Sequence, residues 1–249
     1  MSSETKRLPI IAIARDGGGM FTDGDWIESK DLSEDGIRYL TTGSVGIGEF
    51  KNQGDGYISE ETFERLQCTE VKPGDVLICR LNLPTGRACI VPDLGQKLVT
   101  SVDNVIVRPS HKYDRRYLVY ALSTKSHLEH ASNLARGTTM KRISRSALGR
   151  IRMEMPDRNT QTLVADFLDA ETRRIDGLIT EKGSFITLLR EKRVAVISQA
   201  VTKGLDANAP MKPSGADWLE DVPTHWDVVR LGVLFKEANR KGDPDLPVL

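Results

Sequence analysis

The chain has 249 residues, of which 39% are hydrophobic and 28% are charged. This composition is ordinary for a globular protein with a buried core, and it excludes a disordered chain, a collagen-like chain and a disulfide-stapled miniprotein. No stretch approaches the ~18–20 apolar residues of a membrane span, and the N-terminal residues lack the apolar core of a secretory signal. We therefore expect a cytoplasmic protein without membrane contact.

Lysine plus arginine number 35 and aspartate plus glutamate also number 35, so the formal net charge is zero. That total conceals an uneven distribution. Residues 1–60 contain 6 basic and 11 acidic side chains, whereas residues 108–158 contain 12 basic and 4 acidic ones. A local basic excess attracts phosphate groups, although an ordinary solvated basic face explains this composition equally well.

Up to about residue 108 the chain predicts short β-strands separated by turns, because its apolar runs are rich in β-branched residues and end at Gly, Pro, Asp or Asn. These runs cover residues 37–42, 75–80, 87–91, 98–102 and 104–108. A short helix is expected over residues 57–67, with Ser59 near its start. The three cysteines, Cys68, Cys79 and Cys89, have no C-x-x-C spacing, so we expect free buried thiols rather than a zinc site.

Helices are expected in the second half of the chain. Residues 114–134 are predicted to form one helix with an apolar stripe. A much longer helix is predicted from Thr160 to Lys203, with Asn159 or Thr160 as its cap and Gly204 at its end. The residues after Gly204 have the composition of a linker.

The long helix has a coiled-coil-like apolar stripe with polar interruptions. At about 1.5 Å per residue it would span roughly 65 Å, which is longer than one compact domain needs for its own core. We therefore expect its apolar stripe to contact a partner. The candidate interface residues are Leu168, Ile175, Leu178, Phe185, Leu189 and Val196.

One loop of the basic segment has the residues expected of a nucleic-acid contact. Its cations neutralise phosphates and its hydroxyl groups can bond them, while Arg, Lys, Asn and Gln can bond base edges. The candidates in this loop are Arg136, Thr138, Thr139, Lys141, Arg142 and Arg145. Residues 41–44 and 80–87 are further candidate loops, the second with Arg80, Asn82 and Arg87, although Arg80 could equally pair with an acid such as Asp75.

Patterns for catalysis are weak. Glu49 and Lys51 match only half of a nuclease motif, and His127 and His130 lack a third metal ligand nearby in the sequence. No phosphate-binding loop or G-x-G-x-x-G pattern is present. We expect no catalytic residue, metal or cofactor.

Several segments together resemble the specificity subunit of type I restriction-modification enzymes. Those in the second half are IDGLI from Ile175, LLREKR from Leu188, ISQAVTKGLD from Ile197 and WLEDVPTHW from Trp218. Those in the first half are DGDWI from Asp23, KPGDVLICR from Lys72, GRACIVP from Gly86 and GTTMKRIS from Gly137. Pro156 and Gln161 of the family's helix entry are present, but the acidic residue before the glutamine is missing.

The resemblance implies a subunit that catalyses nothing itself. The family is built from two target-recognition domains, each of which reads one half of a split sequence in double-stranded DNA, held apart by two long antiparallel helices. Methyltransferase subunits dock on those helices, and a separate motor and nuclease subunit cuts the DNA. This chain resembles a half-length form with one recognition domain.

The predicted fold class is therefore α+β, with an irregular β-rich target-recognition domain followed by one long coiled-coil-like helix. We expect the DNA-binding domain over residues 1–156, the spacer helix over residues 157–204, and a linker with the truncated start of a second recognition domain over residues 205–249. Two other classes stay open. One is a self-pairing half-subunit, a homodimer, or an inactive adaptor that acts only through protein contacts, and the other is a small metal-dependent nuclease.

Overall fold

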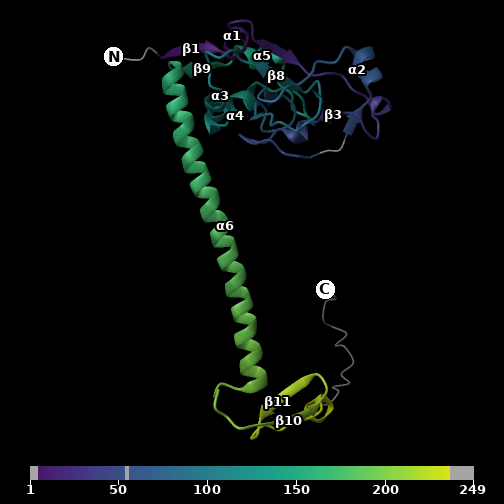
Figure 1. Ribbon diagram of the computed structural model, residues 1–249, viewed down its shortest axis with the longest axis vertical. Coiled ribbons are helices and arrows are strands. Elements are labelled where there is room, and N and C mark those ends of the chain that lie inside the picture. Colours follow the sequence, from purple (N-terminus) through teal and green to yellow (C-terminus); the bar gives the residue numbers. More distant parts are fainter. Residues whose placement is uncertain (1–4, 54–55, 236–249) are drawn as a thin grey trace, which may run out of the picture. The chain divides into compact units, whose positions relative to one another are not determined.

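The computed structural model describes residues 5–53 and 56–235 (Figure 1). The chain divides into two compact units, Met1–Thr172 and Arg173–Leu249. Helix α6 (Arg158–Lys203) begins in the first unit and ends in the second.

Unit 1 contains a four-stranded antiparallel sheet and a smaller three-stranded sheet. The larger sheet has the order β2 (Met20–Asp23), β8 (Asn104–Arg108), β5 (Val76–Cys79) and β6 (Ala88–Ile90). The smaller sheet has the order β4 (Gly56–Ile58), β3 (Ile37–Leu40) and β7 (Leu98–Thr100), in which β3 and β7 run parallel. The five strands predicted from β-branched runs are all present.

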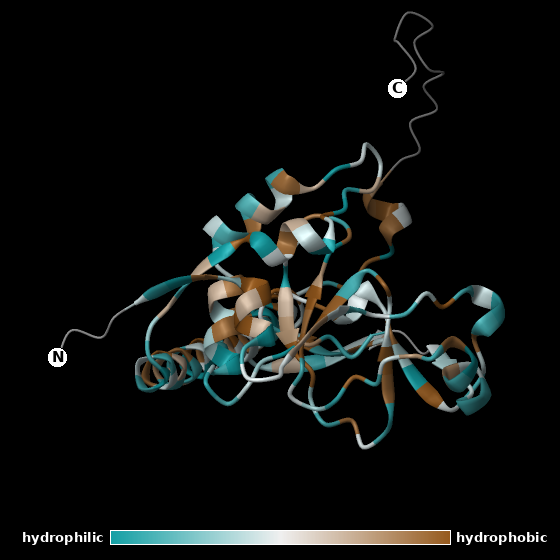
Figure 2. Cartoon of the chain, turned by 90° about the horizontal axis from the view of Figure 1, so that it is seen from above, coloured by the Kyte–Doolittle hydropathy of each residue, from teal (hydrophilic) through white to brown (hydrophobic). Residues whose placement is uncertain are grey.

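The larger sheet is buried on both faces, which explains its continuous apolar runs. Val76 and Ile78 face a core shared with helices, whereas Leu77 and Cys79 face a second core that also contains residues of the smaller sheet. Figure 2 shows hydrophobic residues concentrated on the central strands, helices with both hydrophobic and hydrophilic residues, and mainly hydrophilic outer loops. As predicted, Cys68, Cys79 and Cys89 are free and buried.

Short helices cover the larger sheet. They are α1 (Ile10–Arg15), α3 (Arg115–Leu122), α4 (Lys125–Leu134) and α5 (Arg145–Arg150). The prediction of one helix over residues 114–134 was wrong, because this segment forms two helices, α3 and α4. The Thr124 hydroxyl accepts a hydrogen bond from the His127 amide and so caps a new helix, while the Ser123 hydroxyl donates back to the Val119 carbonyl.

The remaining elements of unit 1 lie at its edges. Strand β1 (Lys6–Pro9) pairs antiparallel with β9 (Arg152–Met155), immediately before α6. Helix α2 (Glu60–Leu66) is shorter than predicted because residues 57 and 58 belong to β4, and Ser59 caps it as expected. Two short 3₁₀ helices, η1 (Ser29–Asp31) and η2 (Thr42–Ser44), complete the unit.

Helix α6 confirms the predicted long helix, but its cap was assigned wrongly. The Asp157 side chain accepts hydrogen bonds from the amides of Asn159 and Thr160, so the cap is the aspartate rather than either of those residues. Gly204, at φ +81°, follows the last helical residue as predicted. No helix in the described ranges combines the length and hydropathy required to cross a membrane.

Unit 2 contains the end of α6, a β-hairpin and a short helix. The hairpin pairs β10 (Met211–Ala216) with β11 (Leu219–Pro223), and α7 covers Leu231–Leu234. The expected linker is therefore partly a strand. Residues 236–249 of the expected truncated second recognition domain lie outside the described residues.

Candidate nucleic-acid interface

Two of the predicted loops lie side by side. Residues 136–142 form a short loop, here called the basic hairpin, that is closed by two backbone hydrogen bonds between Arg136 and Arg142 of 2.9 and 2.8 Å. Residues 80–87, here called the facing loop, pair with it, since the Asn82 amide donates to the Lys141 carbonyl at 2.9 Å and the Ile143 amide donates to the Arg80 carbonyl at 3.0 Å. The structure thus brings both candidate loops to one place.

The turn of the basic hairpin depends on glycine. Gly137 has φ +115°, and a Cβ atom added there would lie 2.3 Å from the Met140 carbonyl oxygen. A side chain would therefore break the turn. Thr138, Thr139 and Lys141 are exposed, so the tip presents two hydroxyl groups and an ammonium group to solvent.

Arg80 is buried and structural. Its guanidinium lies 3.1 Å from the Asp23 carboxylate, and it donates to the Val102 carbonyl at 2.6 Å. The predicted alternative partner, Asp75, instead pairs with Arg108 at 2.6 Å. Burial is the main cause that lowers the pKa of Arg80. Because its hydrogen bonds are internal, Arg80 holds the facing loop in place and has little left to offer a ligand.

Arg87 is structural in the same way. Its guanidinium donates to the carbonyls of Val45 at 2.8 Å and Thr42 at 3.1 Å, at the loop of residues 41–44. Within its own loop it donates to the Pro84 carbonyl at 3.1 Å. It also donates to the carbonyls of Leu81 and Asn82 at 3.2 Å. The candidate loop at residues 41–44 therefore serves to receive Arg87. Asn82 itself is exposed, at φ 60°.

Two aspartates missed by the sequence analysis hold the basic hairpin. The Asp103 carboxylate lies 2.6 Å from Arg142 Nε, and the Asp23 carboxylate lies 3.4 Å from an Arg145 nitrogen as well as near Arg80. These carboxylates offset much of the positive charge of their partners. Asp23 and Asp103 are far in the sequence from the arginines that they bind, so no local pattern could identify them.

A hollow of about 710 Å³ lies beside the basic hairpin. Among the described residues, Arg136, Lys141 and Arg150 have no acidic partner, and the two arginines line the hollow. Arg150 was not predicted as a candidate, although it lies at the end of helix α5 within the basic segment. These three cations, here called the free cations, make the hairpin side of the domain positively charged.

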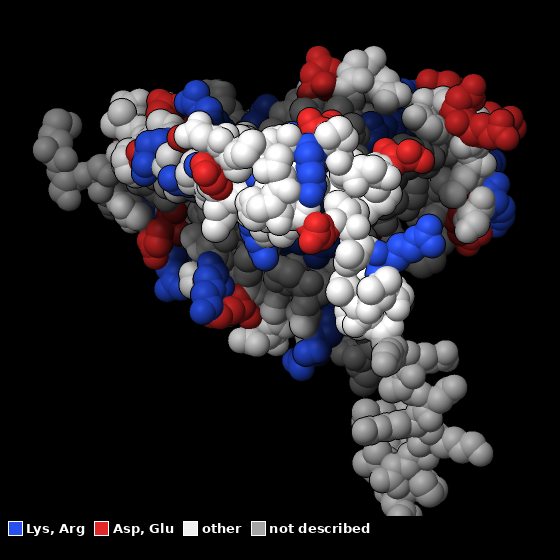
Figure 3. All heavy atoms as spheres, turned by 90° about the horizontal axis from the view of Figure 1, so that it is seen from below, with Lys and Arg blue, Asp and Glu red and all other residues white. Residues whose placement is uncertain are grey.

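Most of the basic excess of residues 108–158 is used inside the protein. Seven of its cations form ion pairs with acids, namely Arg108, Lys112, Arg116, Lys125, Arg142, Arg145 and Arg158. Acidic side chains lie elsewhere on the surface. Glu60, Glu61 and Glu64 of α2 are exposed, and Figure 3 shows a group of acidic side chains at the right-hand edge of the face that it presents. A segment's charge therefore overstates the charge of its surface.

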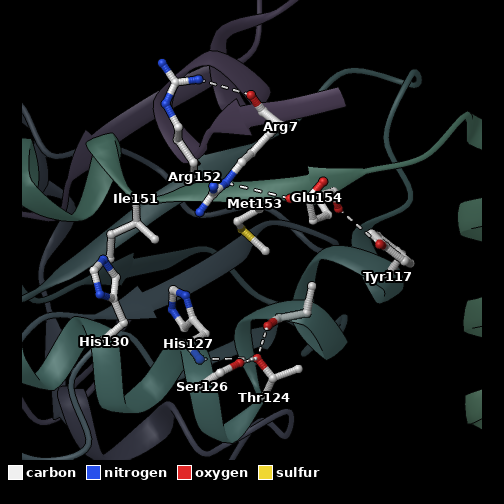
Figure 4. Close-up of a pocket in the computed structure, with 11 residues that line it drawn as sticks. Arg7, Tyr117, Thr124, Ser126, His127, His130, Ile151, Arg152, Met153 and Glu154 are labelled. Atoms are coloured by element: carbon white, nitrogen blue, oxygen red, sulfur yellow. Dashed lines mark hydrogen bonds and ion pairs between the residues drawn. The ribbon is translucent and has the colours of Figure 1, made fainter. Parts of the chain in front are cut away.

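The predicted histidine pair lines a different hollow, of about 410 Å³, between α4 and the β1–β9 pair (Figure 4). His127 is buried, and its Nε2 lies 3.3 Å from the Gly86 carbonyl oxygen, whereas His130 is exposed. Burial is the largest influence on His127 and lowers its pKa to about 4. At neutral pH the ring is therefore uncharged and packs behind the facing loop.

The nuclease half-motif has no metal site around it. Glu49 and Lys51 form a surface ion pair at 3.6 Å. Within residues 5–53 and 56–235, no group of three or more His, Cys, Asp or Glu side chains could hold a metal ion. Burial, the largest cause, raises the pKa of the Cys68 thiol to about 11 and that of Cys89 to about 12, so neither is a thiolate at neutral pH.

The start of α6 is fixed to the rest of unit 1 by a buried polar cluster. Gln161 is 1% exposed, accepts from the Asp114 amide at 2.8 Å and donates to the Pro156 carbonyl at 2.8 Å. Burial alone would raise the pKa of Asp114, but hydrogen bonds from Arg158 and Arg116 outweigh it and lower this pKa to about 2. The cluster fixes where the helix leaves the unit.

The apolar stripe of α6 is open to solvent along most of the helix. Of the predicted interface residues, Leu168 is half-buried, and the other five are between 43% and 56% exposed: Ile175, Leu178, Phe185, Leu189 and Val196. More apolar side chains, such as Ile179 and Ile186, widen this surface. Large exposed apolar surfaces are typical of interaction sites, so this stripe is a candidate interface.

The family is decided by comparison with known proteins. Residues 18–183 match the model of the type I restriction modification DNA specificity domain. The chain belongs to this family. The match covers the basic hairpin, the facing loop and the first half of α6, so the candidate interface described above lies within the matched residues. No curated protein matches the chain.

Solved structures share this specificity-domain fold at low sequence identity. A chain from a structure of type I R-M complex assembly has a TM-score of 0.61 and 16% identity, over 81% of this chain and 46% of that one. The HsdS subunit from Thermoanaerobacter tengcongensis has a TM-score of 0.58 and 16% identity, over 82% and 46%. The S subunit from M. genitalium has a TM-score of 0.50 and 16% identity, over 80% and 46%. The chain thus aligns with less than half of the length of each of these proteins.

Proposed function

We propose that the chain is a DNA-recognition subunit of a type I restriction-modification system, which acts in the cytoplasm and catalyses no reaction itself. It reads one half of a split target sequence with the loops of unit 1. The observation that carries this proposal is the family match over residues 18–183, which contains the basic hairpin. The free cations beside that hairpin supply the charge that a phosphate backbone requires.

The two loops divide the work between position and sequence. Arg136, Lys141 and Arg150 contact phosphates, and the hydroxyls of Thr138 and Thr139 add hydrogen bonds to them. The side chain of Asn82 is exposed beside the hairpin, and its amide group can both donate to and accept from the major-groove edge of adenine. Arg80, Arg87 and their carbonyl partners keep the loops rigid, so that less entropy is lost on binding.

Helix α6 is the docking site for methyltransferase subunits in this proposal, and through them for the motor and nuclease subunit. Its exposed apolar stripe supports this role, because a stripe that spans several turns fits another protein better than a small ligand. The test is to purify the chain with the modification subunit of the same system and to map methylated bases in DNA exposed to the complex. We expect methylation at one defined sequence. Methylation at random sites, or none above the level of the modification subunit alone, would reject the proposal.

The same stripe favours a second candidate, a self-paired form in which two copies align their helices. A two-fold pair would present two identical reading domains and would recognise inverted repeats. Replacing Leu178 and Leu189 by aspartate would place two charges on the stripe and should convert a dimer to a monomer in size-exclusion chromatography with light scattering. Thr180→Asp with Thr187→Asp is the matched control, because at 3.6 residues per turn these positions lie on the opposite side of the helix. A mass that is the same for both double variants and the unaltered chain would show that the stripe does not pair copies.

A further inference from the structure

The proposed DNA face carries two exposed apolar side chains that phosphate contact does not explain. Met140 is 62% exposed in the basic hairpin, and Leu83 is 55% exposed in the facing loop. The backbone amide of Asn82 donates to the Lys141 carbonyl at 2.9 Å. Leu83 follows Asn82 and Met140 precedes Lys141, so the two apolar residues are next to this hydrogen bond on its two sides. Their backbone positions are therefore adjacent, and the two exposed side chains are here together called the apolar tip.

The tip is held rigidly by the surrounding residues. Arg87 donates to the carbonyls of Asn82 and Pro84, which flank Leu83, at 3.2 and 3.1 Å. On the other side, Gly137 allows the backbone to close tightly against the Met140 carbonyl. Apolar side chains on a rigid support keep their exposed surface, whereas a flexible loop would fold over them.

Cations flank the tip. Lys141 follows Met140 directly, and Arg136 closes the same hairpin; within the described residues neither side chain has an acidic partner. An apolar tip between free cations matches the charge pattern of a DNA duplex, in which phosphates run on both sides of the stacked bases. Met, Leu and Pro are among the side chains that DNA-bending proteins insert between base pairs.

We propose that Met140 and Leu83 form a wedge that enters the base stack of the bound half-site and opens one base step. This inference rests on the proposed DNA-recognition function. The phosphate contacts of Arg136 and Lys141 would hold the backbone on either side, and the wedge would make recognition depend on how easily that step unstacks. Such a wedge gives preference for a flexible step that no hydrogen bond reads.

The experiment uses the full chain together with its modification subunit and duplexes that contain its methylation site. 2-Aminopurine, whose fluorescence rises when it unstacks, is placed at each position of the half-site in turn. The unaltered chain should raise the fluorescence at one step, and Met140→Ala with Leu83→Ala should abolish the rise and weaken binding on the order of tenfold, while leaving the salt dependence unchanged. Leu32→Ala, which removes the same atoms from an exposed leucine elsewhere in unit 1, should change neither.

A second measurement guards against a merely local misfolding of the variant. A mismatch at the responsive step is already partly unstacked, so it should tighten binding of the unaltered chain and leave the double variant unaffected. If the unaltered chain binds its site but no position responds, or if the double variant behaves like the unaltered chain, the wedge is refuted and the tip is left as a surface for another protein. If the unaltered chain does not bind DNA, it is the proposed function that fails.

Discussion

Replacing Lys141 by glutamine would remove one positive charge from the basic hairpin without breaking an internal ion pair. Among the described residues, replacing Arg136 of the same hairpin or Arg150 of α5 would likewise break no ion pair. Each phosphate contact releases counterions, so losing one should reduce the slope of log K against log salt by about 0.9. The slope of the triple glutamine variant should therefore be smaller in magnitude by about 2.7. When salt is raised from 50 to 200 mM, the drop in affinity of each single variant should be smaller than that of the unaltered chain by a factor of about 3.5.

The assay is fluorescence anisotropy with a mixed-sequence duplex at several salt concentrations. Arg152→Gln is the matched control, because Arg152 is exposed and basic but lies on β9 beside the histidine hollow. Arg142 is unsuitable for this purpose, since its removal would leave the Asp103 carboxylate without a partner. If the triple variant has the slope of the unaltered chain, or if Arg152→Gln reduces the slope equally, then the hairpin side is not the DNA face.

Three further predictions concern the framework of the site. Burial holds the pKa of folded His127 at about 4, below its ordinary value of 6.5, so protonation favours the unfolded chain. As the pH drops from 6.5 to 4, the free energy of unfolding of the unaltered chain should fall by about 3 kcal/mol more than that of His127→Gln, but by no more than that of His130→Gln. Equal pH profiles of the unaltered chain and His127→Gln in urea unfolding would contradict this. Gln161→Ala leaves the buried Asp114 amide unbonded and should cost roughly 1–3 kcal/mol in urea unfolding; a loss near zero would mean that water replaces the side chain. Gly137→Ala should weaken DNA binding with little change in the melting temperature, whereas Gly95→Ala, also at positive φ but with open space around it, should not affect binding; equal binding by both variants would refute the role of the hairpin turn.

The sequence predicted those parts of the fold that local patterns determine. The runs around Val76 and Val105 formed strands because both faces of the sheet are buried, so that every residue in the run is apolar. The β1–β9 pair was missed, because it joins opposite ends of unit 1 and neither strand has a distinctive pattern. The break at Thr124 was missed because one apolar stripe continues across two separately capped helices.

The sequence predicted which loops form the candidate site, but it could not predict the contacts of their side chains. The sequence pointed to the loops of Lys141 and Asn82, and the structure brings these loops together. The sequence could not distinguish the free cations from cations that are bound inside the protein. Arg80 pairs with an aspartate that is distant in the sequence, and Arg87 binds backbone carbonyls. Carbonyl groups occur at every residue, so a guanidinium that binds them leaves no trace in the sequence.

The most direct test of the central claim is to select DNA from a random duplex pool with the full chain and to sequence what is retained, alone and with the modification subunit. The account predicts enrichment of one short block of fixed bases, or of that block as an inverted repeat if two copies pair through α6, and loss of the enrichment in Gly137→Ala. If the chain retains DNA from the pool but the retained DNA has no enriched sequence, the result would contradict sequence recognition by this chain.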